Sequence, residues 1–172
     1  MDEATTLIRR YCKKGEQAAF RRFYQQESPR LWRFLVAKGC DPEQAYDVVA
    51  DAFMRFVTTI CRDPAYPRAF LYRIALNAHI DQQRRAAVAG KPVDDCILDG
   101  VAAANPDLDL AHDVRTAMSK LYPDEQNLLL LRYWIGMSHA EIAAVLTLPE
   151  GTVRRQAAAA QRKLRDLLGE KE

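Results

Sequence analysis

The sequence lacks the features that would place it in a membrane or on a secretory route. Its 172 residues contain no run of 18 apolar residues, so no membrane-spanning helix is predicted. The chain opens on the polar Met1-Asp2-Glu3, which predicts no secretory signal. From these absences we expect a cytoplasmic protein.

Residues that bind metals or perform covalent chemistry are few and scattered. Cys12, Cys40, Cys61 and Cys96 lie far apart and form no CxxC pair, which favours free thiols in a reducing cytoplasm. The three histidines do not cluster, and the sequence contains no P-loop or Gly-rich phosphate loop. We find no nucleophile beside a base. The sequence therefore predicts no metal, no cofactor and no enzymatic activity.

Helical periodicity is what the sequence has in abundance. Residues 4–38 carry an apolar stripe, with plausible interruptions at Gly15-Glu16 and at Ser28-Pro29. A turn at 39–42 precedes the most regular amphipathic pattern in the chain, over 45–60. Periodic segments continue beyond it, and no alternating strand pattern stands out. These patterns predict an all-α protein.

One segment interrupts this periodicity and divides the chain. Residues 86–108 contain two glycines and two prolines, and through Leu110 five aspartates face one lysine. Such a composition is typical of an extended linker. We therefore expect two small helical domains, residues 1–86 and 109–172, joined by a flexible acidic linker over 87–108.

The last part of the second domain has the pattern of a helix-turn-helix. Ser138 followed by Glu141 forms a capping box that begins one helix, and residues 147–151 interrupt the periodicity. The next helix has an apolar stripe from Val153 to Leu168, opposite a face rich in arginine. A DNA-binding helix-turn-helix and an ordinary helical hairpin with a solvated basic face both fit this pattern. The second domain would then contain four helices, with this pair last.

Two helices of the first domain carry charged faces. Residues 68–85 are basic and include aromatic rings, a combination suited to single-stranded nucleic acid because cations follow phosphates and rings stack on bases. The helix over 45–60 presents Asp47, Asp51 and Thr58 outward. This acidic face is either simply solvated or a docking surface for a basic partner.

The order of these parts resembles the extracytoplasmic-function (ECF) sigma factors of bacterial RNA polymerase, over nearly the whole chain. In the first domain the resemblance is carried by Phe70-Leu71-Tyr72-Arg73-Ile74-Ala75-Leu76-Asn77, followed by Asp81 and Arg84-Arg85. In the second it is carried by Leu121-Tyr122-Pro123, Leu128 to Arg132, Gly136-Met137-Ser138, Glu141-Ile142-Ala143 and Gly151-Thr152-Val153. Several motifs in the right order are more specific than any one of them.

The resemblance implies a function for each domain. The first, sigma region 2, would bind the clamp helices of core RNA polymerase through Asp47 and Asp51, and would bind and melt the −10 promoter element. The second, sigma region 4, would contact the polymerase flap and read the −35 element as duplex DNA. A flipped −10 base would enter the loop Arg62 to Pro67. The implied contacts are Tyr66, Arg73, Asn77, Arg84 and Arg85 for −10, and Thr152, Arg154, Arg155, Gln156 and Arg162 for −35.

The chain departs from the family pattern at two places. Ala158 and Ala159 stand where the family carries long polar side chains, so these positions can only contact a thymine methyl. In the docking helix, Gln44 and Tyr46 replace two usual acids. Because a phosphate adds about −1.5 to −2 charge, we hypothesise that phosphorylation replaces the missing acids, with Thr58 preferred over Thr59.

Two further expectations concern the regulation of the protein and the competing functions. Control is expected from a partner, from the expression level or from modification, with an anti-sigma factor or a Ser/Thr kinase as the partner. The main alternative is a sigma-like adaptor that docks on polymerase or on a regulator without initiating transcription. A two-component DNA-binding regulator is disfavoured, because the first domain has no phospho-acceptor α/β pattern.

Overall fold

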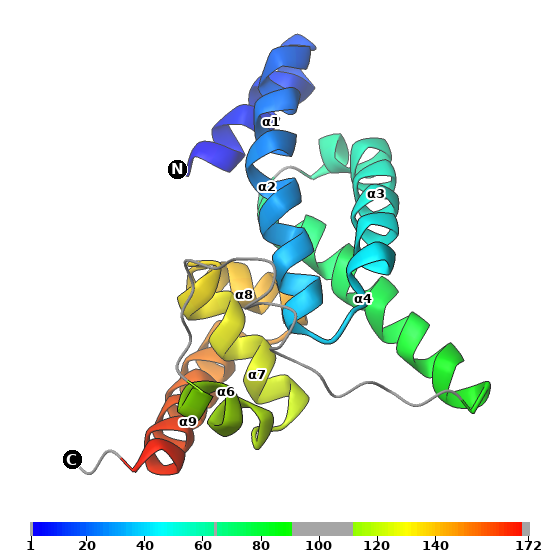
Figure 1. Cartoon of the computed structure of the whole chain (residues 1–172). Coiled ribbons are helices and arrows are strands. Elements are labelled where there is room, and N and C mark those ends of the chain that lie inside the picture. Colours follow the sequence, from blue (N-terminus) through cyan, green and yellow to red (C-terminus); the bar gives the residue numbers. More distant parts are fainter. Residues whose placement is uncertain (1, 64, 91–111, 170–172) are drawn as a thin grey trace.

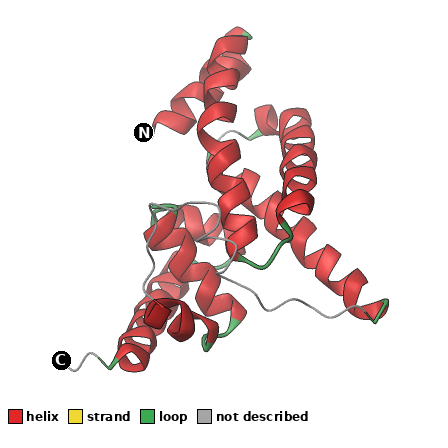
Figure 2. Ribbon diagram, in the orientation of Figure 1, coloured by secondary structure: helices red, strands yellow, loops and turns green. Residues whose placement is uncertain are grey.

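The computed structural model describes residues 2–63, 65–90 and 112–169, and all regular elements within these ranges are helices (Figures 1 and 2). This confirms the predicted all-α class. The first group consists of α1 (Glu3–Lys14), α2 (Gln17–Ala37), α3 (Pro42–Thr59), the 3₁₀ turn η1 (Ile60–Arg62) and α4 (Pro67–Val88). The second consists of α6 (His112–Ser119), α7 (Pro123–Leu129), the π-helical turn η2 (Leu130–Trp134), α8 (His139–Leu146) and α9 (Glu150–Leu168).

The helix boundaries of the first group follow local sequence signals, with one exception. Asp2 and Asp41 cap the starts of α1 and α3, and Gly15 ends α1 with a φ of 66°. The interruption predicted at Ser28-Pro29 is wrong, because α2 continues through it. Phe23 and Leu31, on either side of the proline, are fully buried, and their burial offsets the hydrogen bond that proline cannot donate.

Aromatic side chains form the centre of the first group. The rings of Phe23 in α2 and Phe56 in α3 stack with centroids 5.2 Å apart, and Phe53 meets both edge-on. Leu71 of α4 is fully buried in the same apolar cluster. Aromatic pairs of this kind stabilise the fold by more than the burial of their apolar area alone. The core therefore fixes α4 against α2 and α3.

The second group contains the predicted pair of terminal helices. The Ser138 side chain accepts a hydrogen bond from the Glu141 N–H, and the Glu141 carboxylate accepts one from the Ser138 N–H, so the capping box is present. Thr147 ends α8 in the left-handed conformation, with a φ of 56°. Residues 153, 157 and 160 of α9 are buried, as the stripe predicts. Leu167 is more exposed, at 37%.

The two groups contact each other along α4 and α8. Beyond this contact, the last turns of α4 and α9 project to opposite sides of the molecule (Figure 1). α4 ends at Val88, inside the segment predicted as linker, and residues 91–111 lie outside the described residues, as does most of that prediction. Within the described ranges no helix is both long and apolar enough to cross a membrane.

Candidate nucleic-acid interface

A pocket of about 340 Å³ lies where the loop after η1 enters α4. Pro67 is the first residue of α4, and the loop before it shares the pocket with Phe70 and Arg73 from the first turns of that helix. Tyr66 is 49% exposed at the pocket, where its ring can contact an incoming group. The pocket is lined by Thr59, Arg62, Asp63, Ala65, Tyr66, Phe70, Arg73 and Ala144. The last of these belongs to α8, so the second group of helices forms part of the pocket wall.

The predicted −10 residues lie at two places, the pocket at the start of α4 and the exposed face further along that helix. Arg73 lies in the pocket with Tyr66, and its guanidinium stands 5.5 Å from the centre of the Phe70 ring. Asn77, Arg84 and Arg85 are exposed further along α4, toward its projecting end. The structure therefore brings two of the five predicted residues together and spreads the others along the helix. A charged, ring-bearing pocket that continues into a basic helix can accommodate an unstacked base and its backbone.

The predicted −35 residues lie on the first half of α9, with Arg162 further along. Arg154, Arg155 and Gln156 are exposed, and Thr152 is half-buried. Arg154 forms an ion pair with Glu150 one turn earlier, and the Arg155 guanidinium donates to the Thr152 hydroxyl at 3.5 Å. Since these contacts are exposed and weak, both guanidinium groups can be redirected to a ligand. The face carries cationic donors at the N-terminal end of a helix that can enter a major groove.

The proposed docking face of α3 is exposed but mixed in character. Asp47 and Asp51 are exposed, and Met54 between them and the helix end is 73% exposed. Tyr46 stacks on Trp32 of α2, with ring centroids 5.3 Å apart. The residue that replaces a usual acid therefore packs against a neighbouring helix.

The two candidate phosphorylation sites lie at the C-terminal end of α3. Thr58 is exposed and Thr59 is half-buried. Both hydroxyls donate to the Arg55 carbonyl, at 2.8 and 2.7 Å. A phosphate here would meet the negative end of the helix dipole, which opposes the addition.

A buried ionic network links α2 and α4 to the second group of helices, and the sequence analysis did not identify it. Glu27 of α2 has a side chain only 2% exposed, 3.3 Å from the Arg68 Nε of α4. Arg68 also donates to the Ile135 carbonyl at 3.0 Å and lies 3.9 Å from the capping carboxylate of Glu141. Arg68 therefore joins the two helical groups. Burial raises the pKa of Glu27, against the lowering effect of Arg68 and Arg30.

A second polar contact between the groups involves a buried lysine. The Lys38 ammonium donates to the Pro123 carbonyl at 3.4 Å, and the Lys38 carbonyl lies 3.2 Å from His79 Nε2. Burial lowers the pKa of Lys38 to about 8, partly offset by Asp124. Burial also lowers the pKa of His79.

A sequence signal for part of the ionic network does exist. Glu27 lies four residues after Phe23 and four before Leu31, both buried, so a charge falls on an apolar stripe. Arg68 likewise precedes the buried Leu71 and Ala75 by three and seven residues. A charged residue at such a position implies a buried partner.

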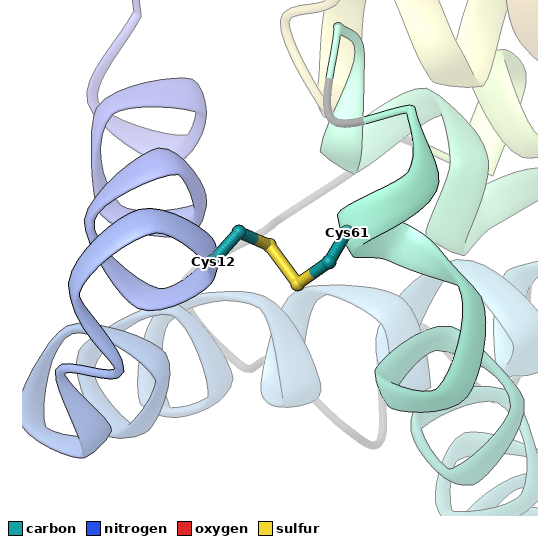
Figure 3. Close-up of a disulfide and its surroundings, with 2 residues drawn as sticks. All are labelled: Cys12 and Cys61. Carbon is teal, nitrogen blue, oxygen red and sulfur yellow. A yellow bond between two sulfur atoms is a disulfide. The ribbon is translucent and has the colours of Figure 1, made fainter.

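The expectation of four free thiols is wrong for two of the cysteines. Cys12 of α1 and Cys61 of η1 form a disulfide, with Cα atoms 5.3 Å apart across 49 residues of sequence (Figure 3). The prediction failed because it considered sequence spacing alone, whereas the fold places α1 beside η1. Cys40 is free and buried, and Cys96 lies outside the described residues. Across the described part of the chain, no group of three or more His, Cys, Asp and Glu side chains could hold a metal ion.

Comparisons with known proteins match both groups of helices. Residues 23–88 match the family model of Sigma-70 region 2, and residues 111–164 match that of Sigma-70, region 4. The ECF RNA polymerase sigma factor SigC of Mycobacterium tuberculosis is 30% identical over 166 residues, covering 93% of this chain and 89% of that protein. SigW of Bacillus subtilis is 27% identical, with 90% of this chain and 94% of that protein covered.

Solved structures agree with this assignment. CnrH in complex with the cytosolic domain of CnrY matches with a TM-score of 0.69 and 27% identity, over 99% of this chain and 100% of that one. For the fold alone, the sigma factor RpoE of Bartonella quintana, in complex with the anti-sigma factor NepR, has a TM-score of 0.68 at 22% identity, over 89% and 98% of the two chains. With regions 2 and 4 both present, the chain belongs to the sigma-70 family, in its ECF group, and acts as a sigma factor that directs RNA polymerase to promoters.

Proposed function

We propose that this sigma factor reads the −10 element with the pocket at Tyr66 and the exposed face of α4, and the −35 element with the exposed face of α9. The observation that carries the proposal is the pocket, where an exposed ring and the Arg73 cation converge at the base of a basic helix. A flipped base needs a cavity and a stacking partner, and its flanking phosphates need cations. Arg84 and Arg85 would supply the phosphate contacts.

The −35 contacts would come from a small set of side chains. Arg154, Arg155 and Gln156 can donate to base edges in the major groove, with Arg162 further along and Thr152 on a phosphate. The exposed Ala158 and Ala159 offer only methyl groups on the same helix. We therefore expect a recognition sequence in which one or two guanines, and a thymine, carry most of the specificity.

Asp47 and Asp51 are the proposed contacts to the clamp helices of core polymerase. Their exposure on one face of α3 supports the proposal, since opposite charges on a partner raise both encounter rate and specificity. The division into domains 1–86 and 109–172 stays a prediction, and the two family matches fall almost entirely within these segments. We infer a cytoplasmic location, because core polymerase and promoter DNA are there.

Control by an anti-sigma factor is part of the proposal. One of the two solved structures is the sigma factor RpoE in complex with the anti-sigma factor NepR, and the other is CnrH in complex with the cytosolic domain of CnrY. In this chain Ala144 of α8 forms part of the pocket wall, and Arg68 holds α4 to α8 and η2. We infer that this closed arrangement has to open before a base can enter. An anti-sigma partner can then inhibit by binding the closed arrangement more tightly than the open one.

The test is transcription in vitro with purified core polymerase on a library of randomised promoters. A sigma factor yields transcripts only when the chain is added, and the enriched templates share −35 and −10 elements at a fixed spacing. The alternative, a sigma-like adaptor, predicts that the chain binds core polymerase but enriches no templates. Tyr66→Ala should reduce transcription from the enriched templates while leaving binding to core polymerase unchanged. An unaltered transcript level in this variant would contradict the role given to the pocket.

A further inference from the structure

The disulfide ties the N-terminal helix to the start of the pocket loop. Cys12 is half-buried on α1, and Cys61 is exposed in η1 (Figure 3). The next residue, Arg62, already lines the pocket, and the loop ends at the buried Pro67. With the disulfide formed, both ends of the loop between Cys61 and Pro67 are fixed to helices.

Other contacts hold α1 independently of this bond. Leu7 and Ile8 are buried in the core, Tyr11 packs on Phe20 with centroids 5.1 Å apart, and Arg10 pairs with Glu16. On the loop side, Ile60 is buried, at 1% exposure, but residues 61–63 are exposed. Reduction would therefore leave the α1 anchor in place and release mainly the exposed start of the loop.

We propose that Cys12 and Cys61 form a redox-responsive site that controls −10 recognition, with the oxidised form binding the −10 strand more tightly. The inference rests on the proposed role of the pocket. A loop that is already ordered loses less conformational freedom when it closes on a base, so the disulfide raises affinity by preorganisation. In a reducing cytoplasm the resting state would be the dithiol, and an oxidant would increase promoter recognition.

Thiol–disulfide exchange with a low-molecular-weight disulfide accounts for the chemistry. The exposed Cys61 thiolate attacks one sulfur of the small disulfide, forming a mixed disulfide and releasing one thiolate. The Cys12 thiolate then attacks the Cys61 sulfur, forms the protein disulfide and releases the second thiolate. The two cysteines lose two electrons to the small disulfide, and the two protons they give up are taken by the released thiolates.

The first measurement follows the bond itself in the full-length protein. Wild type is equilibrated in glutathione buffers of increasing glutathione disulfide fraction, free thiols are alkylated, and peptides are identified by mass spectrometry. A linked peptide containing Cys12 and Cys61 is expected to appear as the buffer becomes oxidising and to vanish with dithiothreitol. Absence of that linked peptide at every ratio overturns the proposal.

The second measurement uses the chain bound to core RNA polymerase and a single-stranded oligonucleotide that carries the −10 element enriched in the transcription experiment. Oxidised wild type should bind it about threefold to tenfold more tightly than reduced wild type. Cys12→Ser should bind with the reduced affinity in both buffers, and so should Cys61→Ser, whose exposed position makes misfolding a poor explanation. The Cys96→Ser control should keep the full response. The proposal is refuted if oxidised and reduced wild type bind the oligonucleotide equally tightly, or if oxidation still raises the affinity of Cys12→Ser.

A third measurement separates this inference from the proposed function. Amide hydrogen exchange at residues 61–63, 65 and 66 in the free protein reports loop order without any DNA. Oxidation should slow exchange in wild type and in Cys96→Ser, but not in Cys12→Ser. If no oligonucleotide binds in either state, the −10 role fails, and the exchange data still support the redox-controlled loop. Exchange that is unchanged by oxidation in wild type overturns the link between disulfide and loop.

Discussion

Replacement of Arg68 by methionine tests the buried network that joins the two helical groups. The variant keeps an unbranched side chain but removes the cation 3.3 Å from Glu27, whose side chain is 2% exposed. It also leaves the Ile135 carbonyl without its donor at 3.0 Å. Breaking one side of a buried pair costs about 3–5 kcal/mol, because the remaining charge is buried without compensation. We expect the loss of stability in Arg68→Met to lie near the lower end of this range, because Glu27 can take up a proton and lose its charge.

Arg30→Met provides the matched control. Arg30 pairs with the same Glu27 oxygen at 3.3 Å, but its side chain is 53% exposed. An exposed partner of this kind contributes below about 1 kcal/mol. Glu27→Gln combined with Arg68→Met should recover much of the stability lost in Arg68→Met alone, because the buried charge is then absent.

Urea unfolding followed by tryptophan fluorescence measures these differences. The chain has two tryptophans, Trp32 in α2 and Trp134 in η2, so Trp134→Phe leaves a reporter of the first group alone. Each variant is compared with wild type in that background. The reasoning fails if Arg68→Met is as mild as Arg30→Met, or if adding Glu27→Gln to Arg68→Met lowers stability further.

The pH dependence of the same variants provides an independent check. Burial raises the pKa of Glu27 above its ordinary value of 4.5, so the folded state favours the protonated form. The contribution of Glu27 to stability is therefore fully present below that value and declines as the pH rises through the raised pKa. Glu27→Gln should gain stability relative to wild type over this window. A difference that stays constant with pH would contradict the burial of an ionisable Glu27.

Three further predictions concern the other sites. Burial lowers the pKa of Lys38 from 10.5 to about 8, so its buried charge destabilises the folded state below pH 8 and this cost declines as the pH rises toward 10.5. Wild type should therefore gain stability over that range relative to Lys38→Met, as measured by urea unfolding at several pH values. Arg155→Ala should lose about 1–3 kcal/mol of −35 binding and relax base preference if its contact is bidentate to guanine, whereas Arg84→Ala should lower the salt dependence of −10 binding; titrations with matched and scrambled duplexes or strands distinguish the two. If phosphorylation controls docking, Thr58→Glu should bind core polymerase more tightly than Thr58→Ala at low salt, and equal binding across salt concentrations excludes that switch.

The helices and the family could be predicted from local information. The period of apolar residues in α3, the capping box of Ser138 and Glu141, and the break after Leu146 depend on residues within one or two turns of each other. The motifs of regions 2 and 4 are also continuous in sequence. Such signals survive in a single sequence because the side chains that produce them interact within one helix or across one turn.

Part of the candidate site could be predicted for the same reason. Tyr66 and Arg73 lie within seven residues on a loop and the helix that follows it, and the structure places both at the pocket. The exposed residues of α9 follow from its helical period. That Ala144 of α8 would form part of the same pocket wall could not be predicted, since it depends on how the two groups of helices pack.

Contacts between segments that are distant in sequence could not be predicted, because only the tertiary structure brings those segments together. Cys12 and Cys61 are 49 residues apart and become partners only because α1 lies beside η1. Arg68 gains its role from Glu27 on one helix and from Ile135, 67 residues later, and neither spacing has a period that could identify it. The helix through Pro29 likewise persists because Phe23 and Leu31 are buried on either side of it. Local propensity sets which segments become helices, whereas burial and long-range pairing decide which charges, thiols and prolines those helices can tolerate.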